Sequence, residues 1–292
     1  MNSNHQHTRE KWLIEISPKN NLFDLNLRET WQYRDLLFLF IKRDVVTVYK
    51  QTILGPLWYL IQPLITSVIF TIIFNTVANI PTGSINPFLF NLAGITIWNY
   101  FSACINGTSD TFKANEGIFG KVYFPRVIMP LSVIFSNLIR LAIQLIIFAC
   151  CYLFFLTKHK AGDFGFAVLL FPILVWVMGL TGLGLGMIVS SLTTKYRDLV
   201  FLVQFGVQLL MYLSAVMYPI SLAQEKLPKA IAIFVIYNPL SWVIEVFRAM
   251  VFQAGSGITF FNLFYPVVCA LVIFLFGLIL FNKTEKNFLD TI

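Results

Sequence analysis

The chain contains 292 residues, of which 58% are hydrophobic and only 12% are charged, and its mean hydropathy is +0.76. A soluble globular protein carries about 25% charged residues, so this chain has too little polar surface to fold in water. The composition excludes a disordered protein, a fibrous protein and a soluble enzyme. It predicts an all-α integral membrane protein that crosses the bilayer several times.

The chain begins with a polar tail, residues 1–26, to which we assign no role. Residues 27–52 combine aromatic side chains, such as Trp31 and Phe38, with basic ones, such as Lys42 and Arg43. The polar positions recur near helical spacing, which predicts an amphipathic helix at the membrane interface, with its basic side chains on lipid phosphates. An ordinary soluble helix is the alternative.

Six membrane-spanning helices are expected within residues 53–285. No charged residue occurs between Gln51 and Ser109, and a segment rich in Pro, Gly, Ser and Asn divides this run into two spans. With four more apolar runs, the expected spans are 57–78, 88–107, 128–156, 165–191, 199–219 and 262–282. An even number of spans puts both termini on one side of the membrane. That side carries 15 Lys and Arg residues against five on the other, so we expect both termini, including the tail 286–292, in the cytoplasm.

Two connections between spans have a distinctive composition. Residues 108–126 are cytoplasmic in this topology and place phenylalanines beside charged residues, which suits a short helix with protruding phenylalanines that docks a partner. A solvated loop whose aromatic side chains touch lipid headgroups is the alternative. Residues 228–253 hold two apolar stretches that each follow a proline and are too short to span, which predicts two short helices entering the membrane from outside. Glu245 and Arg248 lie three residues apart there and can pair on one helix face.

Two spans carry aromatic and amide side chains at helical spacing, so that the side chains in each set share a face. These faces consist of Tyr59, Gln62, Thr66 and Phe70 in the first span, and of Phe205, Gln208 and Tyr212 in the fifth. Aromatic rings stack on the apolar faces of sugars and amides bond to hydroxyl groups, so both faces suit a glycan pathway. Helix packing through polar side chains explains them equally well. Gly182 and Gly186 form a GxxxG pair in the fourth span, which favours internal helix packing.

The usual signatures of catalysis are absent from the sequence. No phosphate-binding loop with GxxxxGK followed by Ser or Thr occurs, so we expect no ATP hydrolysis and no cofactor on this chain. The four cysteines lack CxxC spacing, and we expect no metal site. The net charge of +7 follows from the topology and does not indicate binding to nucleic acid. Arg140 is the one charged residue deep within a span and has no acidic neighbour in sequence, which disfavours a proton-coupled carrier.

Four groups of motifs, in this order along the chain, resemble those of the ABC-2 type permeases that export polysaccharides. They lie at the entry to the first span, in the first and second cytoplasmic loops, and in the extracytoplasmic segment. The motifs are Tyr49–Trp58 with Pro63, then Glu116–Lys121 with Phe124-Pro125-Arg126 and Pro130, then Tyr196-Arg197-Asp198, and finally Tyr218-Pro219 with Tyr237-Asn238-Pro239. The resemblance covers roughly residues 28–285.

The resemblance implies the transmembrane subunit of an ATP-driven exporter in a bacterial inner membrane. Two copies of the chain would form a channel for a lipid-linked polysaccharide, and two copies of a separate ABC ATPase would bind ATP and Mg and drive transport. O-antigen is the first expectation, with capsule polysaccharide and teichoic acid as alternatives. Residues expected to contact the ATPase are Glu116, Phe119, Lys121, Phe124, Arg126, Tyr196, Arg197 and Asp198. The expected gate residues are Tyr218, Pro219, Asn238, Pro239, Glu245 and Arg248.

Two other classes of protein stay open from the sequence. A secondary carrier or channel often shows internal repeats, and none is evident between residues 57–156 and 165–282. A membrane-embedded glycosyltransferase would need acidic residues clustered in a polar loop, and none cluster in this chain.

Overall fold

The computed structural model describes residues 27–50, 55–157, 166–196, 198–253 and 260–288. Within these ranges the chain is helical and contains no strand, which confirms the predicted fold class. The predicted polar tail, part of the first-span motif and Arg197 lie outside the described residues.

Within the described residues, the first half of the chain forms an N-terminal helix pair, three long helical segments, and two short helices in the loop between the second and third of these segments. The elements are α1 (Leu27–Gln32), α2 (Arg34–Lys50), η1 (Gly55–Leu57), α3 (Trp58–Phe70), η2 (Thr71–Val77), α4 (Pro87–Ser109), α5 (Thr111–Ala114), α6 (Glu116–Phe119) and α7 (Ile128–Leu156). The second half consists of η3 (Phe166–Leu170), α8 (Phe171–Thr193), α9 (Leu199–Tyr212), α10 (Ile220–Lys226), α11 (Lys229–Ile236), α12 (Pro239–Phe252) and α13 (Phe260–Phe288).

Five helical segments are long and apolar enough to cross a membrane, and they match five of the six expected spans. They are Trp58–Val77, Pro87–Ser109, Ile128–Leu156, Val168–Thr193 and Phe261–Glu285. The expected fifth span, 199–219, is wrong in its extent: helix α9 ends at Tyr212 after 14 residues. The chain then leaves the helical path, and Ala215 adopts a positive φ of 50°. The physical reason lies in Arg248, described below.

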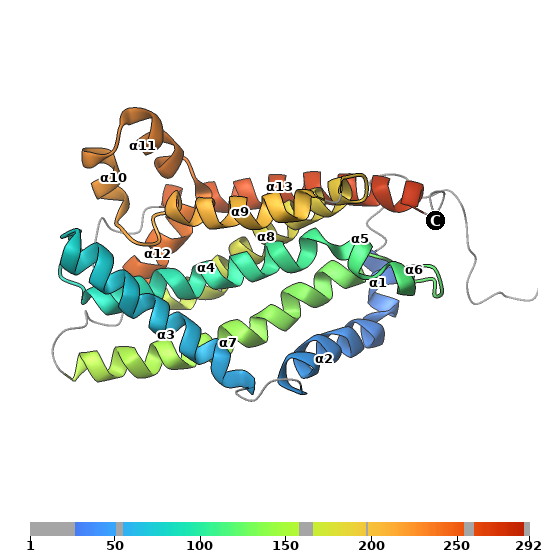
Figure 1. Cartoon of the computed structure of the whole chain (residues 1–292), viewed down its shortest axis with the longest axis horizontal. Helices are drawn as coiled ribbons and strands as arrows, with labels where there is room; N and C mark the ends of the chain where they lie inside the picture. Colours follow the sequence, from blue (N-terminus) through green and yellow to red (C-terminus); the bar gives the residue numbers. More distant parts are fainter. Residues whose placement is uncertain (1–26, 51–54, 158–165, 197, 254–259, 289–292) are drawn as a thin grey trace, which may run out of the picture.

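Helix α4 occupies the centre of the bundle (Figure 1). It packs against α3, α7, α8, α9 and α12, and most of its side chains are buried. Helices α10 and α11 lie at one end of the long helices, whereas α5 and α6 lie at the opposite end (Figure 1). The fold therefore separates the two connections that the sequence marks as distinctive.

The glycines of α8 bring it close to two neighbours. A Cβ on Gly182 would lie 2.8 Å from Cβ of Cys104 in α4, and a Cβ on Gly277 of α13 would overlap the carbonyl of Gly184. Gly186 meets Thr108 of α4 in the same way. The small-residue face thus serves packing within the chain, as the sequence favours.

The predicted interface helix 27–52 is present as the pair α1 and α2, and α2 packs against α7. Phe40 is buried on the packed side, whereas Trp31, Phe38 and Leu39 are exposed. Exposed aromatic and aliphatic side chains next to Lys42 and Arg43 suit the headgroup region of a bilayer. Placement at the membrane surface stays a prediction.

Candidate functional site

The loop between α4 and α7 folds its phenylalanines inward. Phe112 stacks on Phe281 of α13 with a ring centroid distance of 4.5 Å, and Phe119 lies 5.7 Å from Phe124. Phe124 in turn contacts Phe40 of α2 at 5.8 Å. These rings form one buried cluster that ties the loop to the bundle.

Arg126 belongs to the same buried cluster. Its guanidinium donates a hydrogen bond of 3.1 Å to the backbone oxygen of Glu285, lies 3.9 Å from the Glu285 carboxylate, and sits 5.2 Å from the centre of the Phe119 ring. Burial lowers the pKa of Arg126, and the Glu285 carboxylate partly opposes this shift. Arg126 therefore joins the start of α7 to the end of α13.

The expectation that the phenylalanines of residues 108–126 protrude is wrong. Phe119, Phe124 and Arg126 are only 6%, 4% and 5% exposed, because the two rings and the guanidinium pack against one another inside the chain. Glu116 and Lys121 remain exposed on the loop. Contact of any of these residues with an ATPase stays a prediction.

The structure brings the two expected coupling segments to the same end of the bundle. Helix α5 packs against α8, and the hydroxyl of Thr193, the last residue of α8, donates a 3.2 Å hydrogen bond to the backbone oxygen of Ser109 at the end of α4. Tyr196 and Asp198 follow directly and are exposed. Exposed groups of both segments thus lie at one corner of the bundle.

At the opposite end of the bundle, the side chain of Arg248 in α12 is buried, with only 2% of it exposed. It donates hydrogen bonds to three backbone oxygens: Phe90 at 3.3 Å, Ala215 at 2.9 Å and Val216. The expected pair with Glu245 is present at 3.6 Å. The carbonyls of the chain after α9 are therefore satisfied by a guanidinium instead of by a continuing helix.

The other expected gate residues reinforce this junction. Asn238 caps the start of α12 by accepting a 3.0 Å hydrogen bond from Leu240 N, and its amide donates to Leu213 O at 3.2 Å and to Ser214 Oγ at 2.9 Å. The Tyr218 hydroxyl donates to Tyr212 O at 2.7 Å. Pro219 and Pro239 stand at the starts of α10 and α12. Movement as a gate stays a prediction.

The two expected apolar stretches at 228–253 form the separate helices α11 and α12, which meet at 66°. The sequence did not predict α10, which precedes them. Helix α12 is almost fully buried against α4, α8 and α13, whereas α11 exposes Ile233 and Phe234. Only α12 is thus anchored in the bundle core.

The two expected pathway faces lie on separate helices that both pack against α4. Phe205, Gln208 and Tyr212 of α9 are exposed. The α3 face divides into two parts: Thr66 donates to the Gln62 backbone oxygen at 2.8 Å and Phe70 packs edge-on against Phe74 at 5.5 Å. Tyr59 and Gln62 face a polar cleft instead.

That polar cleft lies between α3, α4 and α7 and has a volume of about 210 Å³. Its lining residues come from three helices and are mostly polar. They are Tyr59, Gln62, Asn99, Tyr100, Ser102, Ala103, Asn106, Asn137, Arg140, Leu141 and Gln144. Of these residues, the sequence singled out Tyr59 and Gln62 as part of a pathway face and Arg140 as a charge within a span. It did not indicate the asparagines or Gln144, because their amides come together only when the helices pack.

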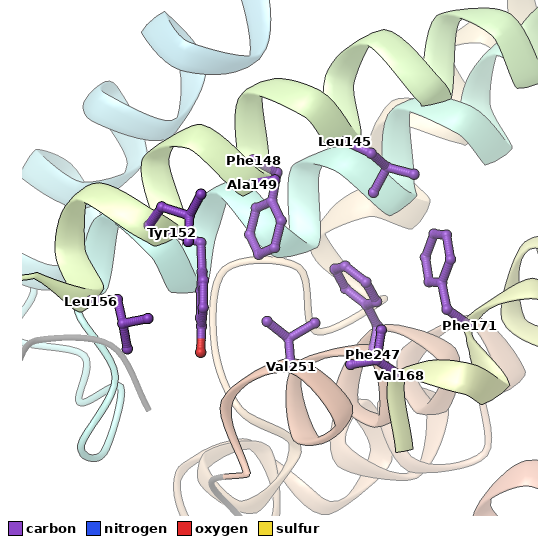
Figure 2. A pocket seen from close by; sticks show the side chains of 10 residues that line it. Leu145, Phe148, Ala149, Tyr152, Leu156, Val168, Phe171, Phe247 and Val251 are labelled. Atoms are coloured by element: carbon purple, nitrogen blue, oxygen red, sulfur yellow. The ribbon is translucent and has the colours of Figure 1, made fainter. Parts of the chain in front are cut away.

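A second, larger pocket of about 430 Å³ is lined by apolar side chains of α7, α8, α12 and the turn before α8 (Figure 2). Phe148, Phe171 and Phe247 point into it, and Tyr152 supplies the one hydroxyl group among its lining side chains (Figure 2). A glycan needs many hydrogen bonds, so this pocket does not suit sugar. Among the described residues, no group of His, Cys, Asp and Glu side chains could hold a metal ion.

Residues 35–252 match the family described as ABC-2 type transporter. The chain is 25% identical over 257 residues to the O-antigen export system permease protein RfbA of Klebsiella pneumoniae, covering 88% of this chain and 94% of that protein. It is 27% identical over 232 residues to RfbA of Myxococcus xanthus, covering 78% and 84%. It is 23% identical over 251 residues to the capsule polysaccharide export inner-membrane protein CtrC of Neisseria meningitidis serogroup A, covering 85% and 90%. Because the family match spans most of the chain and agrees with the helical membrane fold, this protein belongs to the ABC-2 type transporter family.

Proposed function

We propose that this chain is the permease subunit of an ATP-driven exporter that moves a lipid-linked polysaccharide across the cytoplasmic membrane. The observation that carries the proposal is the similarity, over 78–88% of this chain, to permeases named for O-antigen and capsule polysaccharide export. O-antigen is the first candidate for the glycan, and capsule polysaccharide is the second, because relatives of both names cover most of the chain. Teichoic acid is the third.

The proposal assigns ATP hydrolysis to a separate ABC ATPase. The corner formed by α5, α6 and the end of α8 would dock that partner through its exposed charges, Glu116, Lys121 and Asp198. The phenylalanines beneath these charges would transmit the movement, because they join the loop to α2 and α13. Both termini would then be cytoplasmic.

The proposal also places two copies of the chain around the pathway. The α9 side chains Phe201, Phe205 and Tyr212 are 75%, 61% and 46% exposed in the single chain. Their rings would face the glycan or the second copy, and weak, repeated stacking would let a long chain slide. Gln208 adds an amide between the rings.

Disruption of the gene in its native host tests this function. The proposal predicts that the surface polysaccharide disappears and that its lipid-linked form accumulates inside the cytoplasmic membrane. Re-expression of the wild-type chain should restore export. Normal surface polysaccharide in the disrupted strain would refute the proposed function and favour a carrier or channel for another solute.

The pathway assignment has a separate test by cysteine accessibility. Cys150 is exposed and Cys151 and Cys269 are partly exposed, so these three are first changed to alanine. Single cysteines at Phe205 and Gln208 should then react with water-soluble thiol reagents during export. A single cysteine at Val207, on the buried side of α9, is the matched control and should react slowly. Equal protection of all three positions in a working exporter would overturn the pathway assignment.

A further inference from the structure

Arg140 lies near the middle of the long apolar helix α7. It follows Ile128, the first residue of this 29-residue helix, by twelve positions, or about 18 Å along the axis. About 20 residues suffice to cross the hydrocarbon core. With the excess length shared between both ends, Arg140 would lie about 11 Å inside the apolar layer.

No acidic group neutralises this charge within the part of the chain that the structure describes. No carboxylate of those residues lies within 4.0 Å of Arg140, unlike Arg126 and Arg248, which have Glu285 and Glu245. Its guanidinium lies over the Tyr59 ring, whose centre is 5.0 Å from the guanidinium carbon. A guanidinium above a ring keeps N–H groups available for an anion.

The rest of the cleft supplies the hydrogen-bonding groups that an anionic headgroup needs. Asn99, Asn137 and Gln144 add amides around Arg140, and Ser102 adds a hydroxyl. The Asn106 Oδ1 atom is shielded from solvent and has no hydrogen-bond partner among the described residues. A buried acceptor without a donor is costly, so a ligand that also carries a hydroxyl group would complete the site.

The cleft has an exit to the surface of the bundle. Gln62, at its α3 edge, is exposed, whereas Asn137 and Gln144, at its α7 wall, are buried. A group attached to a lipid could thus enter sideways from the bilayer while its chains stay outside. The volume of about 210 Å³ suits one headgroup phosphate and not an extended glycan.

We propose that the Arg140 cleft binds the phosphate group of a lipid within the membrane. Arg140 provides the charge, because its planar N–H fork matches two phosphate oxygens, and the surrounding amides and Ser102 complete the hydrogen bonds. The site itself stands on this geometry. Its assignment to the phosphate of an exported lipid-linked glycan rests on the proposed function.

Native mass spectrometry of the purified full-length chain tests the site with defined probes. Dioctanoyl phosphatidic acid should form an adduct, whereas dioctanoylglycerol, which has the same chains and no phosphate, should bind at least about tenfold more weakly. Arg140→Gln should reduce the phosphatidic acid adduct by a similar factor, and Arg140→Lys by less. Lys113→Gln removes an exposed cation of α5, outside both the cleft and the N-terminal interface helix, and should leave the adduct unchanged.

A second variant guards against misfolding. Asn106→Asp keeps the shape of the side chain and places a carboxylate in the cleft, which should compete with phosphate for Arg140. Equal adducts in wild type, Arg140→Gln and Asn106→Asp would overturn the proposal, as would equal binding of the phosphate-free lipid.

Two further probes identify the source of the phosphate. Dioctanoyl phosphatidylglycerol carries a diester as bilayer lipids do, and binding equal to that of phosphatidic acid would support a bilayer lipid as occupant. Preference for phosphatidic acid would support a terminal lipid phosphate. Inorganic phosphate that binds as well as the lipids would refute a lipid site. None of these binding measurements depends on export. A negative result would therefore refute the lipid site without refuting the proposed function, which the gene disruption tests separately.

Discussion

Arg248 holds the unwound chain after α9 in place, so its removal should destabilise the whole junction. The change Arg248→Met keeps most of the apolar stem and deletes the guanidinium. It leaves the backbone oxygens of Phe90, Ala215 and Val216 without this donor, and it leaves the Glu245 carboxylate without its partner. Breaking a buried ion pair from one side costs about 3–5 kcal/mol.

Thermal unfolding of the purified chain in neutral detergent, followed by tryptophan fluorescence, measures this loss. A loss of about 3–5 kcal/mol lowers Tm by roughly 6–20 °C, with about 2–4 °C for each kcal/mol. Glu245→Gln should cost about 1 kcal/mol, because that side chain is 25% exposed and keeps an acceptor. Arg34→Met is the control, since Arg34 is 54% exposed and should shift stability by less than about 0.5 kcal/mol.

A double-mutant cycle separates the ion pair from the carbonyl contacts. Arg248→Met combined with Glu245→Gln should cost less than the two changes added together, because the orphaned charge is gone. Gly94→Ala should weaken the same junction, since its Cβ would lie 2.5 Å from Arg248 Nη2 and 2.7 Å from Val216 O. If the Tm of Arg248→Met lies within about 2 °C of the wild-type Tm, the variant has lost no more than about 1 kcal/mol. That result would refute the structural role of Arg248.

Three more predictions concern the packing of α8 on α13, the loop between α4 and α7, and ATP hydrolysis. Gly277→Ala should lower the free energy of unfolding by about 1–3 kcal/mol, because its Cβ would overlap the Gly184 backbone. An unchanged free energy of unfolding would contradict the close approach of α8 and α13. Phe119→Ala should cost about 3–5 kcal/mol because the ring is buried, whereas Glu116→Ala should leave stability unchanged and reduce export; equal stability of both variants would contradict the inward packing of the ring. The purified chain alone should show no ATPase activity. ATP turnover by a preparation free of other polypeptides would contradict the proposal that a separate subunit hydrolyses ATP.

The sequence predicts the long helices well because the bilayer imposes a simple demand. About 20 apolar residues without charge are needed for each span, and this signal does not depend on the rest of the fold. The Glu245–Arg248 pair was also predictable, since residues three apart on a helix share a face. Both features arise from neighbours along the chain.

Features that depend on distant residues were not predictable. The early end of α9 requires Arg248, which lies 33 residues beyond the Ala215 carbonyl that it binds. The inward turn of Phe119 requires partners on α2 and α13. The Arg140 cleft joins Gln62 of α3, which the sequence singles out, with amides of α4 and α7 that it does not. In each case tertiary packing, and not local pattern, decides where the side chain lies.

The central claim is that this chain exports a lipid-linked polysaccharide at the expense of ATP hydrolysed by a partner. Inverted membrane vesicles that contain the chain, its co-purifying ATPase and a radiolabelled lipid-linked glycan test it most directly. Added ATP should move the label to the vesicle interior, where an added glycosidase cannot reach it, and a non-hydrolysable ATP analogue should not. Label that stays fully accessible with ATP, or becomes protected without it, would contradict the claim.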